Sequence, residues 1–541
     1  MPVLTSYSDK RVLIVDDMPD MRTSLRSQIS SLAIDKVGMA GSVKEALEQI
    51  RATKFDIILC DYYLGSATDG QQFLDYLRTK NLISRATLFI MVTAETGFER
   101  VVKAAECMPD DYLLKPFTAE SLRIRFERLL EKKDRLAKVD KLQDQGSWPE
   151  VISACDEIIL AKDKYLIDAM RIKGNAMILS NQFGAAADFY NSAIALRPMP
   201  WAQLGLAKAL RGIGNVEQAK NALSELIGDN PNFLAAYDLL GHIHVEEGKH
   251  DAALSVLDSA CKVSPNSLAR QRSIAGVAEA SGDYARVEVA MSSVLKQTRN
   301  SPLNESIDHA KLINALTELG QTEKAITLIK EAKIRFKEAG DVALLCATEA
   351  VTQQKAGNPE LAQQAMNSAM QARAENSGQT TSLAIAKACF AIGKQEEAMS
   401  ILKEVIQNDP DSQVIQGQIS TLLKDHGGQE KAQELIGSSL RQIIKLNNEA
   451  IARAKSGEYE VASKMLTEAA ARLPDNLQIV SNAAYSLLID VFMNGMDATK
   501  IKQALILQQA VMRKKSDHPK LAELAAIMEK IKQKYSLAES A

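Results

Sequence analysis

The stretch that decides the fold of the N-terminal region is FDIILCD, from Phe55 to Asp61, an apolar run that ends on a carboxylate. Amphipathic helical patterns separate it from three further runs of the same kind, which are VLIVDD (Val12 to Asp17), LFIMVT (Leu88 to Thr93) and DYLLKPF (Asp111 to Phe117). Apolar runs that alternate with helical stretches are typical of a parallel sheet with helices on both faces. We therefore predict a doubly wound α/β domain with a five-stranded parallel sheet.

The expected strands cover about residues 11–16, 35–40, 55–61, 88–93 and 111–115. Helices are expected over about 19–32, 42–53, 70–80 and 96–107, with Ser42 as the N-cap of the second. A last helix begins near Thr118 and continues into the charged run EKKDRLAKVDKL, with no Gly or Pro before Gly146. This pattern predicts that a stiff helix joins the first domain to the rest of the chain.

Every strand that can reach the carboxyl edge of this sheet ends on a polar side chain, and these are Asp16, Asp17, Asp61, Thr93 and Lys115. In open α/β sheets, ligands bind outside the carboxyl ends of the strands. Crowded carboxylates suit a hard divalent cation such as Mg²⁺. A carboxylate held in this way can attack a phosphoryl group and form an aspartyl phosphate, while the metal and a lysine balance the transferred charge.

The order and spacing of these residues resemble the receiver domain of bacterial two-component response regulators, over an expected domain of residues 1–132. The resemblance implies phosphorylation by a sensor histidine kinase or a phosphotransfer protein, with Mg²⁺ as cofactor. It implies the following roles: Asp61 as the 4-aspartylphosphate acceptor; Asp16, Asp17, Asp61 and the backbone carbonyl of Tyr63 as metal ligands; Lys115 and Thr93 as catalytic partners; Thr93 and Tyr112 as switch residues.

Each motif also has a purely structural explanation when it is taken alone. FDIILCD could be a core strand with a polar last residue, and Asp16 with Asp17 could form a turn or a helix cap. Only the conjunction of the motifs favours the receiver. One departure lies after the acceptor, where the loop YYLGSATDG places Asp69 and Gly70 eight and nine residues on (69 − 61 and 70 − 61), one later than the family usually has. The lifetime of the phosphoryl group is therefore left open.

A repeat replaces the strand signal from about residue 135 onward. Its frame is a Gly followed five residues later by an Ala and seven residues after that by a second Ala, as in Gly248, Ala253 and Ala260. Successive anchors such as Gly214, Gly248 and Gly282 are 34 residues apart (248 − 214 and 282 − 248). The ten anchors of the frame are Gly146, Asn181, Gly214, Gly248, Gly282, Gly320, Gly357, Gly393, Gly427 and Gly457.

This region resembles a tetratricopeptide-repeat solenoid, which we expect over residues 133–541 with the segment LAELAAIMEKIKQKY as a C-terminal capping helix. Small residues seven apart share one helix face and permit close packing, while Gly permits the turn between two helices. Such solenoids commonly hold partner proteins or peptides, so an unidentified partner protein is expected here. The frame blurs between 370 and 382 and beyond 475, so the repeat count is left open.

Composition favours a globular protein of several domains or a repeat array, with 541 residues, 46% hydrophobic residues and a net charge of −3. Its six cysteines, Cys107 among them, form no metal-ligand spacing and fit a reduced cytoplasm. No stretch approaches a membrane span, so we expect a cytoplasmic protein without membrane contact. The basic segments are interleaved with acids, which favours solvated faces over nucleic-acid binding. A homodimer is left open.

The leading hypothesis is a signalling adaptor, not an enzyme with an external substrate, in which phosphorylation of Asp61 controls partner binding by the solenoid. In it, the face formed by the fourth helix, fifth strand and fifth helix of the receiver transmits the change. Two alternatives are a transcription regulator that contacts nucleic acid or the transcription machinery, and a constitutive scaffold whose receiver is a phosphate sink. Loss of Asp61 would leave the function of such a scaffold intact, whereas direct nucleic-acid binding would weaken steeply with salt.

Overall fold

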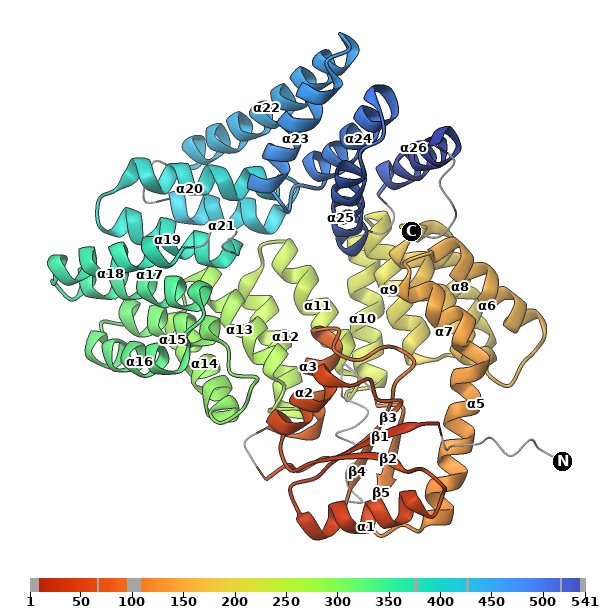
Figure 1. The fold of residues 1–541 in the computed structure, drawn as a ribbon. Coiled ribbons are helices and arrows are strands. Elements are labelled where there is room, and N and C mark those ends of the chain that lie inside the picture. The colour runs from red at the N-terminus through yellow and green to blue at the C-terminus, as the bar shows by residue number, and fades with distance from the viewer. Residues whose placement is uncertain are drawn as a thin grey trace. The chain divides into compact units, whose positions relative to one another are not determined.

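A computed structural model describes residues 9–65, 68–94, 109–373, 378–424, 428–515 and 518–535. Its helices and strands divide into two compact units, Met1–Asp308 and His309–Ala541. The first unit contains the α/β domain and the beginning of a long helical region, whereas the second is helical throughout its described residues (Figure 1). The expected fold class, a doubly wound sheet followed by an all-α solenoid, is thereby confirmed.

The N-terminal domain contains a five-stranded parallel sheet of order β2-β1-β3-β4-β5. β3 is central, and every residue of it is buried. The order reverses between β1 and β3, which is where a doubly wound sheet opens a crevice at its carboxyl edge. The strands are β1 (Arg11–Val15), β2 (Lys36–Ala40), β3 (Ile57–Asp61), β4 (Leu88–Thr93) and β5 (Asp111–Leu114).

Helices cover both faces of this sheet. Their bounds are α1 (Pro19–Ser30), α2 (Val43–Ala52), α3 (Gly70–Thr79) and α5 (Ala119–Asp144). Apolar residues of α1 and α5 form one core with one face of the sheet, and those of α2 and α3 form a second core with the other face. Ser42 caps α2 as expected, because its side chain accepts a hydrogen bond from the Glu45 backbone N–H. The helix expected over 96–107, and Cys107 in it, lie outside the described residues.

α5 is a single helix of 26 residues, shared between the α/β domain and the helical region. It begins directly after Thr118, as the sequence indicated, and Thr118 and Ser121 form a capping box there. Its first half buries Phe126 and its neighbours against the sheet. Its second half buries Leu136 and Val139 against α6 (Trp148–Leu160). The predicted stiff connection is therefore present, and the expected domain boundary between residues 132 and 133 falls inside this helix.

Antiparallel helix pairs follow α6 through the rest of the first unit. Their bounds are α7 (Leu166–Leu179), α8 (Phe183–Leu196), α9 (Pro200–Ile213), α10 (Val216–Asp229), α11 (Leu234–Glu246), α12 (His250–Val263), α13 (Leu268–Ser281) and α14 (Tyr284–Thr298). A further small residue permits close packing of these helices: a Cβ on Gly205 of α9 would lie 2.2 Å from the ring of Tyr190. Ala253 and Ala260 are fully buried on one face of α12.

α15 (Ser306–Glu318) crosses into the second unit, which continues the helix pairs. The further bounds are α16 (Thr322–Arg335), α17 (Ala339–Lys355), α18 (Pro359–Ala372), α19 (Gln379–Ala391), α20 (Gln395–Asn408), α21 (Gln413–Leu423), α22 (Gly428–Lys455), α23 (Tyr459–Arg472), α24 (Leu477–Asn494), α25 (Ala498–Lys514) and α26 (Lys520–Tyr535). α26 covers the end of this unit's last core with Leu524, Ile527 and Ile531.

The anchors of the repeat frame are the turns between paired helices. Nine of the ten predicted anchors lie in the described residues, and all nine have a positive φ, from +58° at Asn181 to +94° at Gly214. Glycine reaches this left-handed region without the steric penalty of a Cβ, and Asn tolerates it better than most residues. The tenth anchor, Gly427, lies outside the described residues. The regular period therefore arises from one turn geometry used again and again.

The regular frame is interrupted at α22. This helix has 28 residues, about twice the length of its neighbours such as α23 with 14. It occupies most of the interval between Gly427 and Gly457, so no turn separates a second helix of one pair from the first helix of the next.

A membrane-spanning helix would need about 18 apolar residues, and no helix in the described part of the chain meets that length and hydropathy.

Candidate phosphoacceptor site

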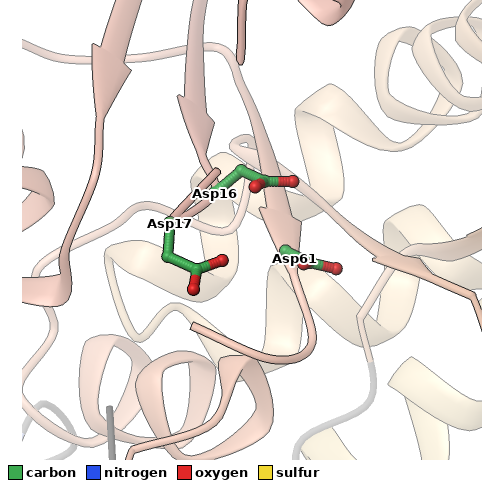
Figure 2. A group of neighbouring side chains, drawn as sticks. All are labelled: Asp16, Asp17 and Asp61. Atoms are coloured by element: carbon green, nitrogen blue, oxygen red, sulfur yellow. The ribbon is translucent and has the colours of Figure 1, made fainter. Parts of the chain in front are cut away.

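Three carboxylates meet at the carboxyl edge of the sheet. Asp16 directly follows β1, and Asp61 is the last residue of the neighbouring strand β3. Oxygen atoms of Asp16, Asp17 and Asp61 all lie within 4.8 Å of one another, and Figure 2 shows the three side chains gathered beyond the strand ends. The structure therefore brings together the three side chains that the sequence predicted as metal ligands.

The ammonium group of Lys115 bridges two of these carboxylates. Its Nζ lies 3.1 Å from Oδ2 of Asp16 and 3.2 Å from Oδ1 of Asp61. Lys115 directly follows β5, and its backbone N–H donates to the carbonyl of Thr93 at 2.7 Å, so β4 and β5 together place the lysine. A cis peptide bond links Lys115 to Pro116. β1 lies on one side of the acceptor strand β3 and β5 lies on the other, so Lys115 reaches Asp61 from the side opposite to Asp16.

Local hydrogen bonds hold Asp16 in place. Its side chain is buried, and its Oδ1 accepts the backbone N–H of Met18 at 2.9 Å. The guanidinium of Arg22 donates to its backbone carbonyl at 2.6 Å. Asp17 lies against the loop that follows β3, where Gly65 has a φ of +62° and where an added Cβ would lie 2.1 Å from Oδ2 of Asp17. Gly65 is therefore a residue of the site that the sequence did not single out.

Burial dominates the electrostatics of Asp61. The residue is only 9% exposed, and removal from water raises the pKa of its carboxyl group above the ordinary value. The positive charge of Lys115 opposes that rise, while the negative charge of Asp16 adds to it. A hydrogen bond from the Tyr62 backbone N–H to Oδ1, 3.0 Å long, favours the ionised form. Asp61 is therefore an ionisable group whose charge depends on Lys115.

The two predicted switch residues lie on β4 and β5. Thr93 is the last residue of β4 and is buried. Tyr112 pairs with Met91 across β4 and β5, and its ring packs against the core formed by α2, α3 and the sheet. Burial, reinforced by the charge of Asp75, raises the pKa of the Tyr112 phenol. Their roles in switching stay predictions.

The donor set fits a divalent cation. Three carboxylates and one ammonium carry a formal charge of −2 (−3 + 1), which a divalent ion would neutralise. Carboxylate oxygens are ligands that Mg²⁺ accepts while it retains several waters. The backbone of Tyr63, the fourth predicted ligand, pairs with Asp69 in an isolated antiparallel bridge, which fixes the course of the loop beside the site. Coordination by its carbonyl stays a prediction.

The start of α3 packs onto the end of the acceptor strand, a feature that the sequence did not single out. The backbone N–H of Gly70 donates to the carbonyl of Tyr62 at 2.7 Å, and a Cβ on Gly70 would lie 2.4 Å from the carbonyl oxygen of Asp61. Asp69 and Gln72 form a capping box at this helix terminus. The pair Asp-x-x-Gln before an apolar run is a sequence signal for such a box. The longer loop includes residues 66 and 67, which lie outside the described residues.

Family models match both parts of the chain. The model described as "Response regulator receiver domain" matches residues 12–127. Three models described as "Tetratricopeptide repeat" match residues 177–243, 234–267 and 381–412. The chain therefore carries a receiver domain at its N-terminus and tetratricopeptide repeats in its C-terminal region, as the sequence indicated.

The receiver domain has curated relatives among chemotaxis proteins. The chain is 28% identical over 122 residues to chemotaxis protein CheY of Pseudomonas aeruginosa, covering 23% of this chain and 97% of that protein. It is 29% identical over 126 residues to chemotaxis protein CheY-3 of Vibrio cholerae, covering 23% of this chain and 92% of that protein. Both similarities are confined to about the first quarter of the chain and leave the solenoid uncompared.

Solved structures show weaker similarity. A tetratricopeptide repeat protein from Parabacteroides merdae is 13% identical, with 49% of this chain and 98% of that chain covered and a TM-score of 0.30. The Cut9–Hcn1 hetero-tetramer of the APC/C is 16% identical, with 57% and 61% covered and a TM-score of 0.30. The repeat assignment rests on the family models, the helix pairs and the turn geometry described above.

Proposed function

We propose that this protein is a cytoplasmic response regulator in which phosphorylation of Asp61 controls the binding of a partner protein by the solenoid. The observation that supports this most directly is the bridge from Lys115 to Asp16 and Asp61 beside a group of three carboxylates. Without an ammonium group, burial and two neighbouring negative charges would favour the protonated form of the acceptor carboxyl group. The geometry therefore suits a carboxylate nucleophile.

In the proposed reaction, an oxygen of Asp61 attacks the phosphorus of a phosphohistidine on a sensor kinase or phosphotransfer protein. The new O–P bond forms as the N–P bond to the donor histidine breaks, and that histidine retains the bond's electron pair. Asp16, Asp17 and Asp61, with the carbonyl of Tyr63, would hold Mg²⁺, which when bound neutralises charge on the transferring oxygens. The ammonium of Lys115 would pair with the phosphoryl group.

The remaining residues would detect the product. The Thr93 hydroxyl, at the end of the strand beside β3, would donate a hydrogen bond to the phosphoryl group, and Tyr112 would repack after it. We propose no external substrate: the chemistry of the receiver is limited to its own phosphorylation and the later hydrolysis of the acyl phosphate. The tetratricopeptide region would provide the output by holding a protein.

Phosphorylation by a radiolabelled small phosphodonor with Mg²⁺ tests the acceptor. We expect label on the wild-type chain and its loss in Asp61→Asn, because an amide cannot attack phosphorus as a carboxylate does. Asp134→Asn is the matched control, since Asp134 is exposed on α5 and lies outside the site. Equal labelling of Asp61→Asn and the wild type would contradict the proposed acceptor.

Partner capture tests the output. The full chain would be used as bait with and without the phosphodonor, alongside Asp61→Asn. The proposal expects the donor to change recovery of the same partner by the wild type but not by the variant. Equal recovery in all samples would mean that the solenoid is a constitutive scaffold.

A further inference from the structure

The receiver contacts the solenoid at a second place, far in sequence from the shared helix α5. The side-chain Nε2 of Gln72, in the first turn of α3, donates to the backbone carbonyl of Asn266 at 2.8 Å and to Oε1 of Gln297 at 2.7 Å. Asn266 lies between α12 and α13, and Gln297 lies near the end of α14. At the other end of α3, Lys80 lies 3.0 Å from Glu305. We call the contacts of Gln72 with Asn266 and Gln297 the α3 contact.

The α3 contact is well made and protected from water. Gln72 is 6% exposed, although it is a polar residue of a surface helix. Its two amide hydrogens have one acceptor each, and its Oε1 accepts the backbone N–H of Asp69 at 3.1 Å. Gln297 is oriented in turn, because its Nε2 donates to Ser293 and leaves Oε1 for Gln72. A buried polar group with all partners present is costly to separate.

The same helix turn touches the phosphoacceptor. Gln72 Oε1 binds Asp69, whose side chain caps the Gln72 backbone N–H at 2.8 Å. The next residue, Gly70, lies against the backbone carbonyl of Asp61, with no room for a Cβ. A displacement of the chain at Asp61 therefore displaces the first turn of α3. The turn from Asp69 to Gln72 thus belongs both to the surroundings of the acceptor and to the α3 contact.

We propose that the α3 contact is a coupling device: it holds the receiver on the α12–α14 part of the solenoid, and occupation of the acceptor weakens it through the first turn of α3. This inference rests on the proposed function. A phosphoryl group adds bulk at Asp61 and replaces the single carboxylate charge with about two negative charges on the phosphoryl oxygens, beside the Tyr62 N–H and the start of α3. The route differs from the expected one through the fourth helix, fifth strand and fifth helix.

Coupling is reciprocal, so a change on the solenoid side must alter the acceptor. The decisive variant is Gln297→Ala, which removes the acceptor for Gln72 but leaves the capping box and every receiver residue intact. The control is Asn266→Ala, because Asn266 contributes its backbone carbonyl, and its exposed side chain is dispensable. Gln72→Ala is less informative, since it also removes the capping box.

The probe is beryllium fluoride with Mg²⁺, a phosphoryl mimic, titrated into the full-length chain. We expect Gln297→Ala to bind it roughly two- to tenfold more tightly than the wild type, the range of one lost hydrogen bond. Asn266→Ala should match the wild type. Hydrogen exchange should show that beryllium fluoride exposes the Asn266 loop in the wild type, and that Gln297→Ala exposes it without the probe.

Two outcomes would overturn the inference in different ways. If wild type and Gln297→Ala bind beryllium fluoride with equal affinity and the Asn266 loop exchanges unchanged, the α3 contact is a static joint, and the proposed function stands without it. If neither protein binds beryllium fluoride, the acceptor assignment itself fails, and the coupling fails with it.

Discussion

At the scale of single residues, the proposed chemistry depends on the charge balance around Lys115. Its ammonium lies between Asp16 and Asp61 and offsets one of three negative charges. We expect Lys115→Ala to slow phosphorylation by a small phosphodonor by roughly two orders of magnitude, as expected for loss of one group that stabilises transferring charge. The same variant should bind Mg²⁺ more tightly, because the local formal charge becomes −3.

Opposite changes in the two measurements distinguish an electrostatic role from misfolding. Mg²⁺ affinity can be followed by calorimetry on the full chain, and the phosphorylation rate by radiolabel. A disrupted fold would weaken both together. Lys138→Ala is the control, because it removes an exposed lysine of α5 outside the site and should leave both values unchanged.

We expect the stability of the receiver to depend on pH through Asp69. Burial raises the pKa of its carboxyl group from 3.8 to about 6, although backbone hydrogen bonds from Gln72 and Gln71 oppose the rise. The folded state therefore holds the proton more tightly than the unfolded state, so the stability from this group is full below pH 3.8 and falls as pH rises to about 6.

We expect Asp69→Asn to remove that loss while it retains an N-cap oxygen for α3. At pH 7 the variant should gain up to roughly 3 kcal/mol in the free energy of unfolding of the receiver, the equivalent of two pKa units. Thermal unfolding of both chains between pH 4.5 and pH 7 measures it. A constant difference between variant and wild type across that range would show that the charge of Asp69 has no part.

The site residues could be predicted because each one ends a strand. Asp61, Thr93 and Lys115 follow apolar runs, and parallel strands bring their carboxyl ends to one edge, so spacing alone places them together. Gln72 could not be found in this way. Its partners are 194 and 225 residues away, and one of them is a backbone carbonyl that has no side-chain signature.

At the scale of elements, α5 belongs to two cores, and its continuity is testable with proline. Ala137 is exposed in the middle of α5, beside the buried Leu136. Ala137→Pro should destabilise the helix by about 3 kcal/mol or more, because proline removes one intrahelical hydrogen bond and clashes with the preceding turn. Hydrogen exchange of the second half of α5 and of α6 should rise.

Ala119→Pro is the matched control on the same helix. Ala119 is the first residue of α5, and Thr118 before it is already extended, with φ −105° and ψ 159°. Proline is accepted at the first helical position, and the preceding residue prefers an extended backbone. Exchange that rises equally in both variants would mean that the two halves of α5 do not depend on its continuity.

The turns between helices show which elements could be read from the sequence. Gly282 ends α13 with a φ of +79°, whereas Gly276 lies inside that helix, where an added Cβ would have no neighbour within 4 Å. In the sequence both residues are simply glycines, and only the repeat spacing marks Gly282 as a turn. The interval from Gly427 to Gly457 kept the spacing nearly intact, yet a continuous helix fills most of it. Spacing predicts where turns are allowed, and not whether each one forms.

Substitution by alanine should separate the two glycines of α13. Gly276→Ala should stabilise the helix by up to about 1 kcal/mol, because Ala loses less backbone entropy on folding. Gly282→Ala should destabilise it by about 1 kcal/mol or more, because a Cβ disfavours the left-handed region. Urea denaturation of the full chain, followed by helical circular dichroism, gives both signs. Two shifts in the same direction would contradict the turn assignment.

At the scale of the whole molecule, the receiver does not form a compact unit of its own. The first compact unit, Met1–Asp308, includes the receiver together with helices up to α14. Two connections account for this: α5 contributes to the cores on either side of it, and α3 contacts the α12–α14 part of the solenoid. Two connections at different places restrict the receiver more than one linker would. The proposed signal from Asp61 would therefore reach the repeats without a flexible tether.

Because α5 belongs to two cores, a fragment that cuts or exposes this helix should be less well packed than the full chain. A fragment that starts at residue 137 lacks Leu136 and the first half of α5, so its first helix pair loses part of its core. A fragment that starts at Ala119 retains that pair but exposes Phe126 and Leu129, which pack against the sheet in the intact chain. We expect proteases to cut α5 and α6 rapidly in the first fragment, and the second fragment to self-associate.

Limited proteolysis and light scattering on both fragments, beside the full chain, test this expectation. The full chain should resist cleavage within α5, because both halves of the helix are packed. A fragment from residue 137 that is monomeric and as resistant in α6 as the full chain would show that the solenoid folds independently of the receiver. In that case the shared helix would be a simple connection, and any control of the repeats by Asp61 would depend on the α3 contact alone.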